Sequence, residues 1–324
     1  MIYKMTALWA DGLDPDYEPH KVMIERDTLI DTARGDRPVK IKVYYPVNHT
    51  MTDLPVIIWS HGLGGSVDGA AFLSRYLSSH GYVMVHVQHE GTDSSLWEGK
   101  KGHPWDIIRA TTITRDVTLN RYADIPFVLD QLRSWMEDHP DIALHADLSM
   151  LGMSGHSFGA LTAQVMAGMK FPDAQGELLD LRDQRFKAGI LYSPGSIEHL
   201  GDMDPNDVYP SINIPLFHMT GTKDGSPLSD LGYEMRLTVY EHTNTEKHLM
   251  VLKDGDHMVF TGSRGKLGHT SNRKTHEAII KVASLAYWDV QLKSDEVARE
   301  WLTEGGLKAY LRDNATYETT PKAA

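Results

Sequence analysis

The segment Gly155-His156-Ser157-Phe158-Gly159 constrains the fold more than any other part of this 324-residue chain. It follows a predicted strand over Leu148–Met153 and precedes a predicted helix over Phe158–Met169. Glycines on both sides of the serine let the backbone turn sharply from strand to helix without clashes between Cβ atoms. The amides at the start of the helix add partial positive charge beside the hydroxyl. In that context the segment predicts a nucleophile, Ser157, although the five-residue pattern alone would arise by chance in roughly one chain in ten of this length.

Short β-branched runs alternate with longer helical patterns, which predicts an α/β fold with a mostly parallel sheet and helices on both faces. The predicted strands are Lys40–Tyr45, Val56–Ser60, Val83–Gln88, Leu148–Met153, Ala188–Tyr192, Leu216–Thr220 and Leu249–Leu252, with Val22–Arg26 as an antiparallel edge strand. The predicted helices are Ala70–Ser79, which ends near Gly81, then Thr114–Asp138, Phe158–Met169, Thr275–Leu292 and a last one around Asp295–Leu302.

The chain contains no internal repeat, low-complexity tract or Gly/Ser linker, so we expect one domain over residues 1–324. Four stretches fit the core pattern poorly and are expected insertions: 91–112, 171–186, 197–210 and 262–273. Such insertions usually lie over the carboxyl ends of the strands, where ligands bind, and the alternative for each is a plain surface loop. Trp97 and Trp105 in the first insertion are candidates for a substrate pocket, and the alternative is that they pack the loop down.

A serine hydroxyl needs a general base, and the base needs an acid to orient it. In a strand-turn-helix context of this kind, the chain order is serine, then Asp or Glu, then histidine. Asp224 comes just after the strand Leu216–Thr220, and His257 follows the next strand in a Gly-containing turn. We therefore predict a catalytic triad of Ser157, Asp224 and His257. Asp254 and Asp256 are alternatives for the acid, but their closeness to His257 in sequence favours a role in the turn.

Two backbone amides are expected to form an oxyanion hole. One is the amide of Phe158, the residue after the nucleophile. The other should come from the loop after the strand Val56–Ser60, which reads His61-Gly62-Leu63-Gly64-Gly65, and we place it at Leu63. The alternative is an ordinary Gly-rich turn.

Composition excludes several other chemistries. The net charge of −12 argues against non-specific binding to nucleic acid, which needs clustered Lys and Arg. The absence of cysteine excludes a disulfide, a thiolate metal site and a cysteine nucleophile. His86 and His89 lie three residues apart on a predicted strand and should point to opposite faces, so we do not expect them to share a metal. We predict no metal and no cofactor.

The N-terminal apolar run is too short for a signal peptide, and no stretch reaches the ~18 apolar residues of a membrane helix. We therefore expect no transmembrane segment and a cytoplasmic location. The alternative is a secreted or periplasmic protein whose leader has been removed.

Several of these segments resemble the platelet-activating-factor acetylhydrolase family and its bacterial relatives, often labelled predicted dienelactone hydrolases. They are Trp59-Ser60-His61-Gly62-Leu63-Gly64-Gly65, Leu77-Ser78-Ser79-His80-Gly81-Tyr82, the helix segment from Arg121 to Asp130, and the Ser157 motif. The similarity runs roughly from Val39 to His257, with an echo in Ala286–Leu292.

The resemblance implies the α/β-hydrolase fold, an esterase with a Ser-Asp-His triad, oxyanion amides at Leu63 and Phe158, short acyl groups and no metal. The chain departs from it in two ways. Ala160 stands where a second glycine is common, and true dienelactone hydrolases use a cysteine nucleophile, which this chain lacks.

The expected function is hydrolysis of a small-molecule carboxylic ester through an acyl-enzyme. The alternatives are an amidase, a transacylase or a polyester or lipid-surface hydrolase on the same triad. A non-catalytic binding protein is a further alternative, which a complete triad disfavours.

Overall fold

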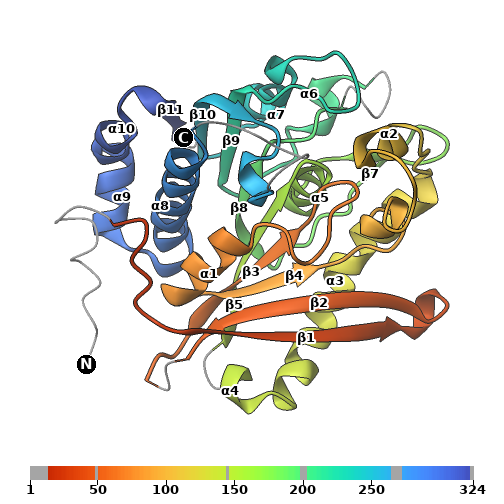
Figure 1. Cartoon of the computed structure of the whole chain (residues 1–324), viewed down its shortest axis with the longest axis horizontal. Helices are drawn as coiled ribbons and strands as arrows, with labels where there is room; N and C mark the ends of the chain where they lie inside the picture. Colours follow the sequence, from red (N-terminus) through yellow and green to blue (C-terminus); the bar gives the residue numbers. More distant parts are fainter. Residues whose placement is uncertain (1–13, 48–49, 144–145, 198–202, 264–271, 322–324) are drawn as a thin grey trace.

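The computed structural model describes residues 14–47, 50–143, 146–197, 203–263 and 272–321. Its main feature is a nine-stranded sheet with the order β1-β2-β4-β3-β5-β8-β9-β10-β11 (Figure 1). The strands are β1 (Val22–Asp31), β2 (Arg37–Pro46), β3 (Leu54–Ser60), β4 (Val83–Val87), β5 (Ala146–His156), β8 (Phe186–Tyr192), β9 (Leu216–Lys223), β10 (Lys247–Asp256) and β11 (Ala315–Thr320). The six strands from β4 to β10 run parallel, and β1, β2 and β11 pair antiparallel at the two sides.

Side chains of the central strands alternate between two apolar cores. In β3, Val56 and Ile58 belong to one core and Ile57 and Trp59 to the other. Because every residue of β3 is buried, the strand reads as a continuous apolar run, as expected when helices cover both faces of a parallel sheet.

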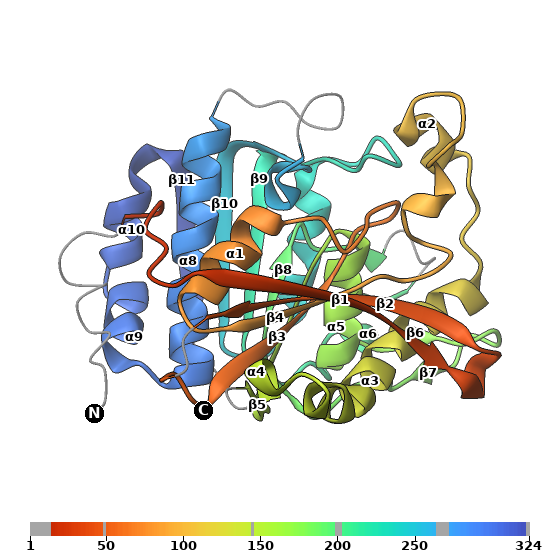
Figure 2. The same ribbon diagram turned by 60° about the horizontal axis from the view of Figure 1, so that its bottom comes forward.

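Helices cover both faces of the sheet (Figures 1 and 2). One core contains residues of α3 (Arg115–Glu137) and α5 (Phe158–Ala167), and the other contains residues of α1 (Ala71–Ser79) and α8 (Arg273–Lys293). Two further helices, α9 (Glu296–Thr303) and α10 (Gly306–Leu311), pack beside α8. The remaining elements are short: α2 (Pro104–Arg109), α4 (Pro140–Ala143), α6 (Pro205–Val208), α7 (Thr238–His242) and the hairpin β6 (Phe171–Pro172) and β7 (Leu178–Leu179).

The predicted α/β architecture is confirmed, and most differences concern where elements end. Five strands end later than expected: β1 reaches Asp31, β2 reaches Pro46, β5 reaches His156, β9 reaches Lys223 and β10 reaches Asp256. The last described strand, β11, and the helix α10 were not predicted. The C-cap of helix α1 is His80, so Gly81, near which the helix was expected to end, lies one residue beyond the observed cap. None of the helices in the described ranges is long and apolar enough to cross a membrane.

Because β3, β5, β8, β9 and β10 run parallel, their carboxyl ends lie along one edge of the sheet. The segments that carry Leu63, Ser157, Asp224 and His257 all follow these ends. The topology therefore brings the predicted site residues to the same side of the molecule.

Candidate active site

Ser157 occupies a strained turn between β5 and α5. Its φ of 57° and ψ of −116° are unusual for a residue with a side chain. A Cβ atom on Gly159 would lie 1.9 Å from the carbonyl oxygen of Ser60, and one on Gly155 would lie 2.3 Å from the carbonyl oxygen of Gly159. The two glycines are therefore required by close backbone packing. The Ser157 amide donates to the carbonyl of Tyr192 at 3.0 Å, which ties the turn to β8.

His257 and Asp224 are in direct contact although 33 residues separate them. Nδ1 of His257 lies 2.8 Å from Oδ1 of Asp224, whose carboxylate is fully buried. Oδ2 of the same carboxylate accepts a hydrogen bond from the hydroxyl of Thr220 at 2.9 Å. The arrangement fixes Nδ1–H toward the carboxylate and leaves Nε2 as the nitrogen that can act as a base.

The two alternative acids have other partners. Asp254 forms an exposed ion pair with Lys223 at 2.8 Å. Asp256 accepts a hydrogen bond from the amide of Met258 at 2.9 Å, which is a turn interaction.

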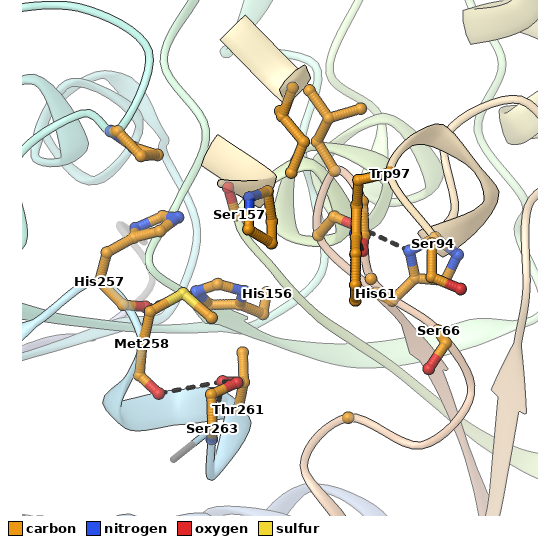
Figure 3. Close-up of a pocket in the computed structure, with 18 of the residues that line it drawn as sticks. His61, Ser66, Ser94, Trp97, His156, Ser157, His257, Met258, Thr261 and Ser263 are labelled. Atoms are coloured by element: carbon orange, nitrogen blue, oxygen red, sulfur yellow. Dashed lines mark hydrogen bonds between the residues drawn. The ribbon is translucent and has the colours of Figure 1, made fainter. Parts of the chain in front are cut away.

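Ser157 and His257 both line a cavity of about 340 Å³. Figure 3 shows the imidazole of His257 and the side chain of Ser157 facing each other at one end of this cavity. His156, next to the nucleophile, lies within 2.7 Å of the carbonyl oxygen of His257 through its Nε2. That contact joins the serine turn to the histidine turn.

Two polar residues that sequence analysis missed surround the acid and the histidine. The hydroxyl of Ser193 donates to Oδ1 of Asp224 at 2.8 Å and also lies 2.8 Å from Nδ1 of His257. Arg236 is buried, with Nε at 2.9 Å from Oδ1 of Asp224 and Nη2 at 3.0 Å from Nδ1 of His257. The guanidinium also donates to backbone carbonyls: Nε to that of Asp224, Nη1 to those of Ser193 and Pro194, and Nη2 to that of Gly225.

These contacts determine the charges in the site. Burial opposes ionisation of Asp224, but the cation of Arg236, the imidazole of His257 and the hydrogen bonds to the carboxylate outweigh it, so the pKa is lowered. Burial has the largest effect on His257 and lowers its pKa, and the cation of Arg236 lowers it further. Asp224 raises it, but the net pKa lies below the usual range. At neutral pH the site therefore holds a carboxylate and a neutral imidazole.

The predicted oxyanion amides lie near the nucleophile. Phe158 is the first residue of α5, so its amide has no partner within the helix. Leu63 lines the same cavity as Ser157, and no hydrogen bond within the described part of the chain occupies its amide. The roles of Leu63 and Phe158 as oxyanion donors remain predictions.

A buried arginine, Arg121 of α3, connects the loop of Leu63 to the start of α5. Its guanidinium donates to the hydroxyls of Thr92 and Ser60 at 2.8 Å, to the carbonyl of His61, and to the hydroxyl of Thr162 in α5 at 2.9 Å. It also lies over the Phe158 ring at 4.4 Å from the centroid. Burial lowers its pKa to about 9, so it stays charged at neutral pH. Arg121 thereby holds both predicted oxyanion segments.

Ser60, to which Arg121 donates, begins a second hydrogen-bonded chain of a serine, a histidine and an aspartate. Oγ of Ser60 is 2.9 Å from Nε2 of His89, and Nδ1 of His89 is 3.0 Å from Oδ2 of Asp124. All three side chains are fully buried. Ser60 lines neither the cavity described above nor a second one, of about 200 Å³, that Ser157 also lines. Since substrate has no access to Ser60, we interpret this chain as a structural support.

The first insertion forms a wall of the cavity. Trp97 and Trp105 both line it, and the indole nitrogen of Trp97 donates to the carbonyl of Gly64 at 2.7 Å. Pro227 and Leu228, in a loop after Asp224 that was not predicted to matter, also line it. The second predicted insertion, 171–186, contributes no residue to either cavity at Ser157. Parts of the other two, residues 198–202 and 264–271, lie outside the described residues. Of the last insertion, Gly262 and Ser263 line the larger cavity.

Among the described residues, no three His, Asp or Glu side chains are grouped as a metal site would require. His86 and His89 have separate partners, because Nε2 of His86 lies 2.6 Å from the hydroxyl of Ser74 and His89 contacts Ser60 and Asp124.

Comparison with protein families gives one match, over residues 16–98, to the family described as "Platelet-activating factor acetylhydrolase, isoform II". The chain resembles this family. The match confirms the resemblance inferred from the loop of Leu63, and together with the sheet it identifies the α/β-hydrolase fold. It begins before Val39 and ends before Ser157, so the nucleophile, acid and histidine lie outside the matched segment. A search of curated proteins finds no match to the chain. The acetylhydrolase resemblance supports a hydrolase activity.

Proposed function

We propose that this chain is a serine carboxylic-ester hydrolase that works through an acyl-enzyme. Ser157 is the nucleophile, His257 the general base and acid, and Asp224 the residue that orients His257. The substrate is a small-molecule ester with a short acyl group, and no cofactor takes part.

One observation carries the proposal. A serine in a strained strand-to-helix turn lies in the same cavity as an imidazole whose Nδ1 is 2.8 Å from a buried carboxylate. Three segments far apart in sequence supply these groups in the order expected for the fold. The acetylhydrolase resemblance over residues 16–98 supports the same class of reaction.

The proposed reaction has two stages. His257 takes the proton of Ser157 as Oγ attacks the ester carbonyl, and Asp224 steadies the imidazolium that forms. The amides of Leu63 and Phe158 bind the oxyanion. His257 then gives its proton to the leaving alcohol. Water attacks the acyl-enzyme in the same way, and the acid is released from Ser157.

The test compares two serine variants. We expect Ser157→Ala to lower ester turnover by several orders of magnitude and to abolish covalent labelling by a fluorophosphonate, because the nucleophile is gone. Ser60→Ala is the matched control, since Ser60 belongs to the buried second chain and should leave the labelling intact. Ester turnover close to wild type in Ser157→Ala, or labelling lost only in Ser60→Ala, would contradict the proposal.

A further inference from the structure

Two cavities meet at Ser157. The larger, of about 340 Å³, contains His257 and the tryptophans of the first insertion. The smaller, of about 200 Å³, lies next to Phe158 and the first turns of α5. Both cavities share Leu63, Ser157, Pro227 and Leu228.

The chemistry of acyl transfer assigns a different half of an ester to each cavity. In the tetrahedral intermediate, the carbonyl carbon carries the serine oxygen, the oxyanion, the leaving alcohol and the acyl chain. The leaving oxygen must lie beside His257, which gives it a proton. Only the larger of the two cavities is lined by His257, and only the smaller by Phe158. We infer that the larger cavity holds the alcohol half of the substrate and the smaller one holds the acyl half, an assignment that rests on the proposed function.

The walls of the smaller cavity suit a compact, uncharged acyl group. Its apolar lining comes from Leu63, Ile113, Phe158, Leu161, Leu228 and Met235. Its volume falls below the range of about 300–1,000 Å³ that is usual for drug-sized ligands. Among the described residues, Arg236 is the one charged residue in its lining, and that guanidinium pairs with Asp224 and donates to four backbone carbonyls. A free carboxylate on the acyl group would therefore have no cation to pair with.

The larger cavity suits a bulkier alcohol that has both a flat apolar part and hydrogen-bonding groups. The Trp105 ring lies 6.4 Å from the His257 ring, centroid to centroid, so the alcohol beside His257 would contact this indole. Polar side chains stand in the same lining: Ser66, Asp68, Ser94, Glu98 and Ser263. The substrate class is thus an ester of a short apolar acid with a larger aromatic or polar alcohol.

The assignment has a kinetic consequence. Attack forms the bond from Oγ of Ser157 to the carbonyl carbon, and the bond to the alcohol oxygen breaks as His257 delivers the serine proton to it. The alcohol then leaves the larger cavity while the acyl group stays in the smaller one. Water takes the place of the alcohol, gives a proton to His257 and bonds to the carbonyl carbon. The bond from that carbon to Oγ then breaks as His257 returns the proton to Ser157, and the acid is released. Deacylation therefore depends on the smaller cavity, and the choice of alcohol depends on the larger one.

The experiment uses one variant in each cavity and burst kinetics with p-nitrophenyl acetate and hexanoate. Leu161→Phe reduces the space for the acyl chain, and we expect deacylation of the hexanoyl enzyme to slow by about tenfold relative to the acetyl enzyme. Leu161→Ala enlarges the same space and should shift the preference toward the longer chain. Trp105→Ala should leave both deacylation rates within about twofold of wild type but lower kcat/KM for 2-naphthyl acetate by about tenfold relative to methyl acetate.

Leu178→Ala is the control, because Leu178 is an exposed leucine outside both cavities. The assignment is overturned if Trp105→Ala changes the ratio of the deacylation rates of the hexanoyl and acetyl enzymes. It is also overturned if both Leu161 variants change only the selectivity for the alcohol. Failure of the wild-type protein to turn over any of these esters, or to react with a fluorophosphonate, is a different result. It would contradict the proposed function itself, and the assignment with it.

Discussion

Nη2 of Arg236 lies 3.0 Å from Nδ1 of His257, on the side of the imidazole that faces Asp224. A buried cation at this distance disfavours the protonated imidazole and favours the ionised carboxylate, because Coulomb interactions are strong away from water. The site thus adds a fourth group, the cation of Arg236, to a simple Ser-His-Asp chain.

Replacing Arg236 should shift the pH dependence of activity. His257 acts as a base only when neutral, and Arg236 lowers its pKa, so activity is retained toward lower pH. In Arg236→Met the pKa of His257 should rise, and the acidic limb of the kcat/KM profile should move to higher pH. Arg236→Lys keeps the charge and should shift it less. An unchanged acidic limb in a folded Arg236→Met protein would show that the cation does not act on His257.

Asp224→Asn tests the orientation of the imidazole. The amide is similar in shape but no longer stabilises Nδ1–H, so we expect kcat to fall by about 10⁴, the size of effect seen when a triad carboxylate becomes an amide. Thr220→Val is the control, because it removes only the hydrogen bond to the other carboxylate oxygen. Equal losses in the two variants would mean that the carboxylate acts mainly by holding the loop.

The parts of the site that sequence analysis predicted are those with a local signature. The turn at Ser157 needs glycines at 155 and 159 because a Cβ atom at either position would clash with the backbone. This requirement appears directly in the sequence. Asp224 and His257 follow strand ends, so the order of the elements along the chain was sufficient to predict that these two side chains lie close together, as their 2.8 Å contact shows.

The parts that were missed depend on tertiary contacts. Arg236 lies in a short 3₁₀ helix, Tyr233–Arg236, and nothing nearby in sequence marks it as a partner of Asp224. Ser193 follows β8 and meets His257 only through the pairing of β8, β9 and β10. Strand β11 has a mixed polar sequence that becomes a strand by pairing with β10. One signal could have pointed to Ser193: like Asp224, it comes directly after the carboxyl end of a strand, and the two strands are neighbours in the sheet.

Arg121 should matter for turnover although it lines neither cavity at Ser157. It binds the loop of Leu63 through His61 and the start of α5 through Thr162. Arg121→Lys keeps the charge but cannot reach all these acceptors from one ammonium group. We expect kcat to fall by about 10- to 100-fold with a smaller change in KM, since the two amides predicted to bind the oxyanion would be less well placed. Arg115→Lys, an exposed position on the same helix, is the control, and equal kcat values in the two variants would argue against this role.

Buried histidines make stability depend on pH. Burial lowers the pKa of His86 and His218 to about 3 and that of His89 to about 4, whereas the unfolded chain binds protons near pH 6.5. Unfolding therefore takes up protons between about pH 4 and 6.5, and the free energy of unfolding must fall as the pH decreases through this window. Asp124, whose pKa the surrounding Arg37 and His89 lower to about 2 against the effect of burial, acts in the same direction at still lower pH.

Urea unfolding at several pH values between 4.5 and 7 measures this dependence. We expect a slope of up to about 1.4 kcal/mol per pH unit for each of these histidines. His218→Asn keeps a donor for the carbonyl of His248 but does not titrate, so its slope should be shallower by up to one such contribution. Stability that stays constant from pH 6.5 to 4.5 would mean that these imidazoles are protonated in the folded protein, because only equal proton binding by the folded and unfolded chains removes the dependence on pH.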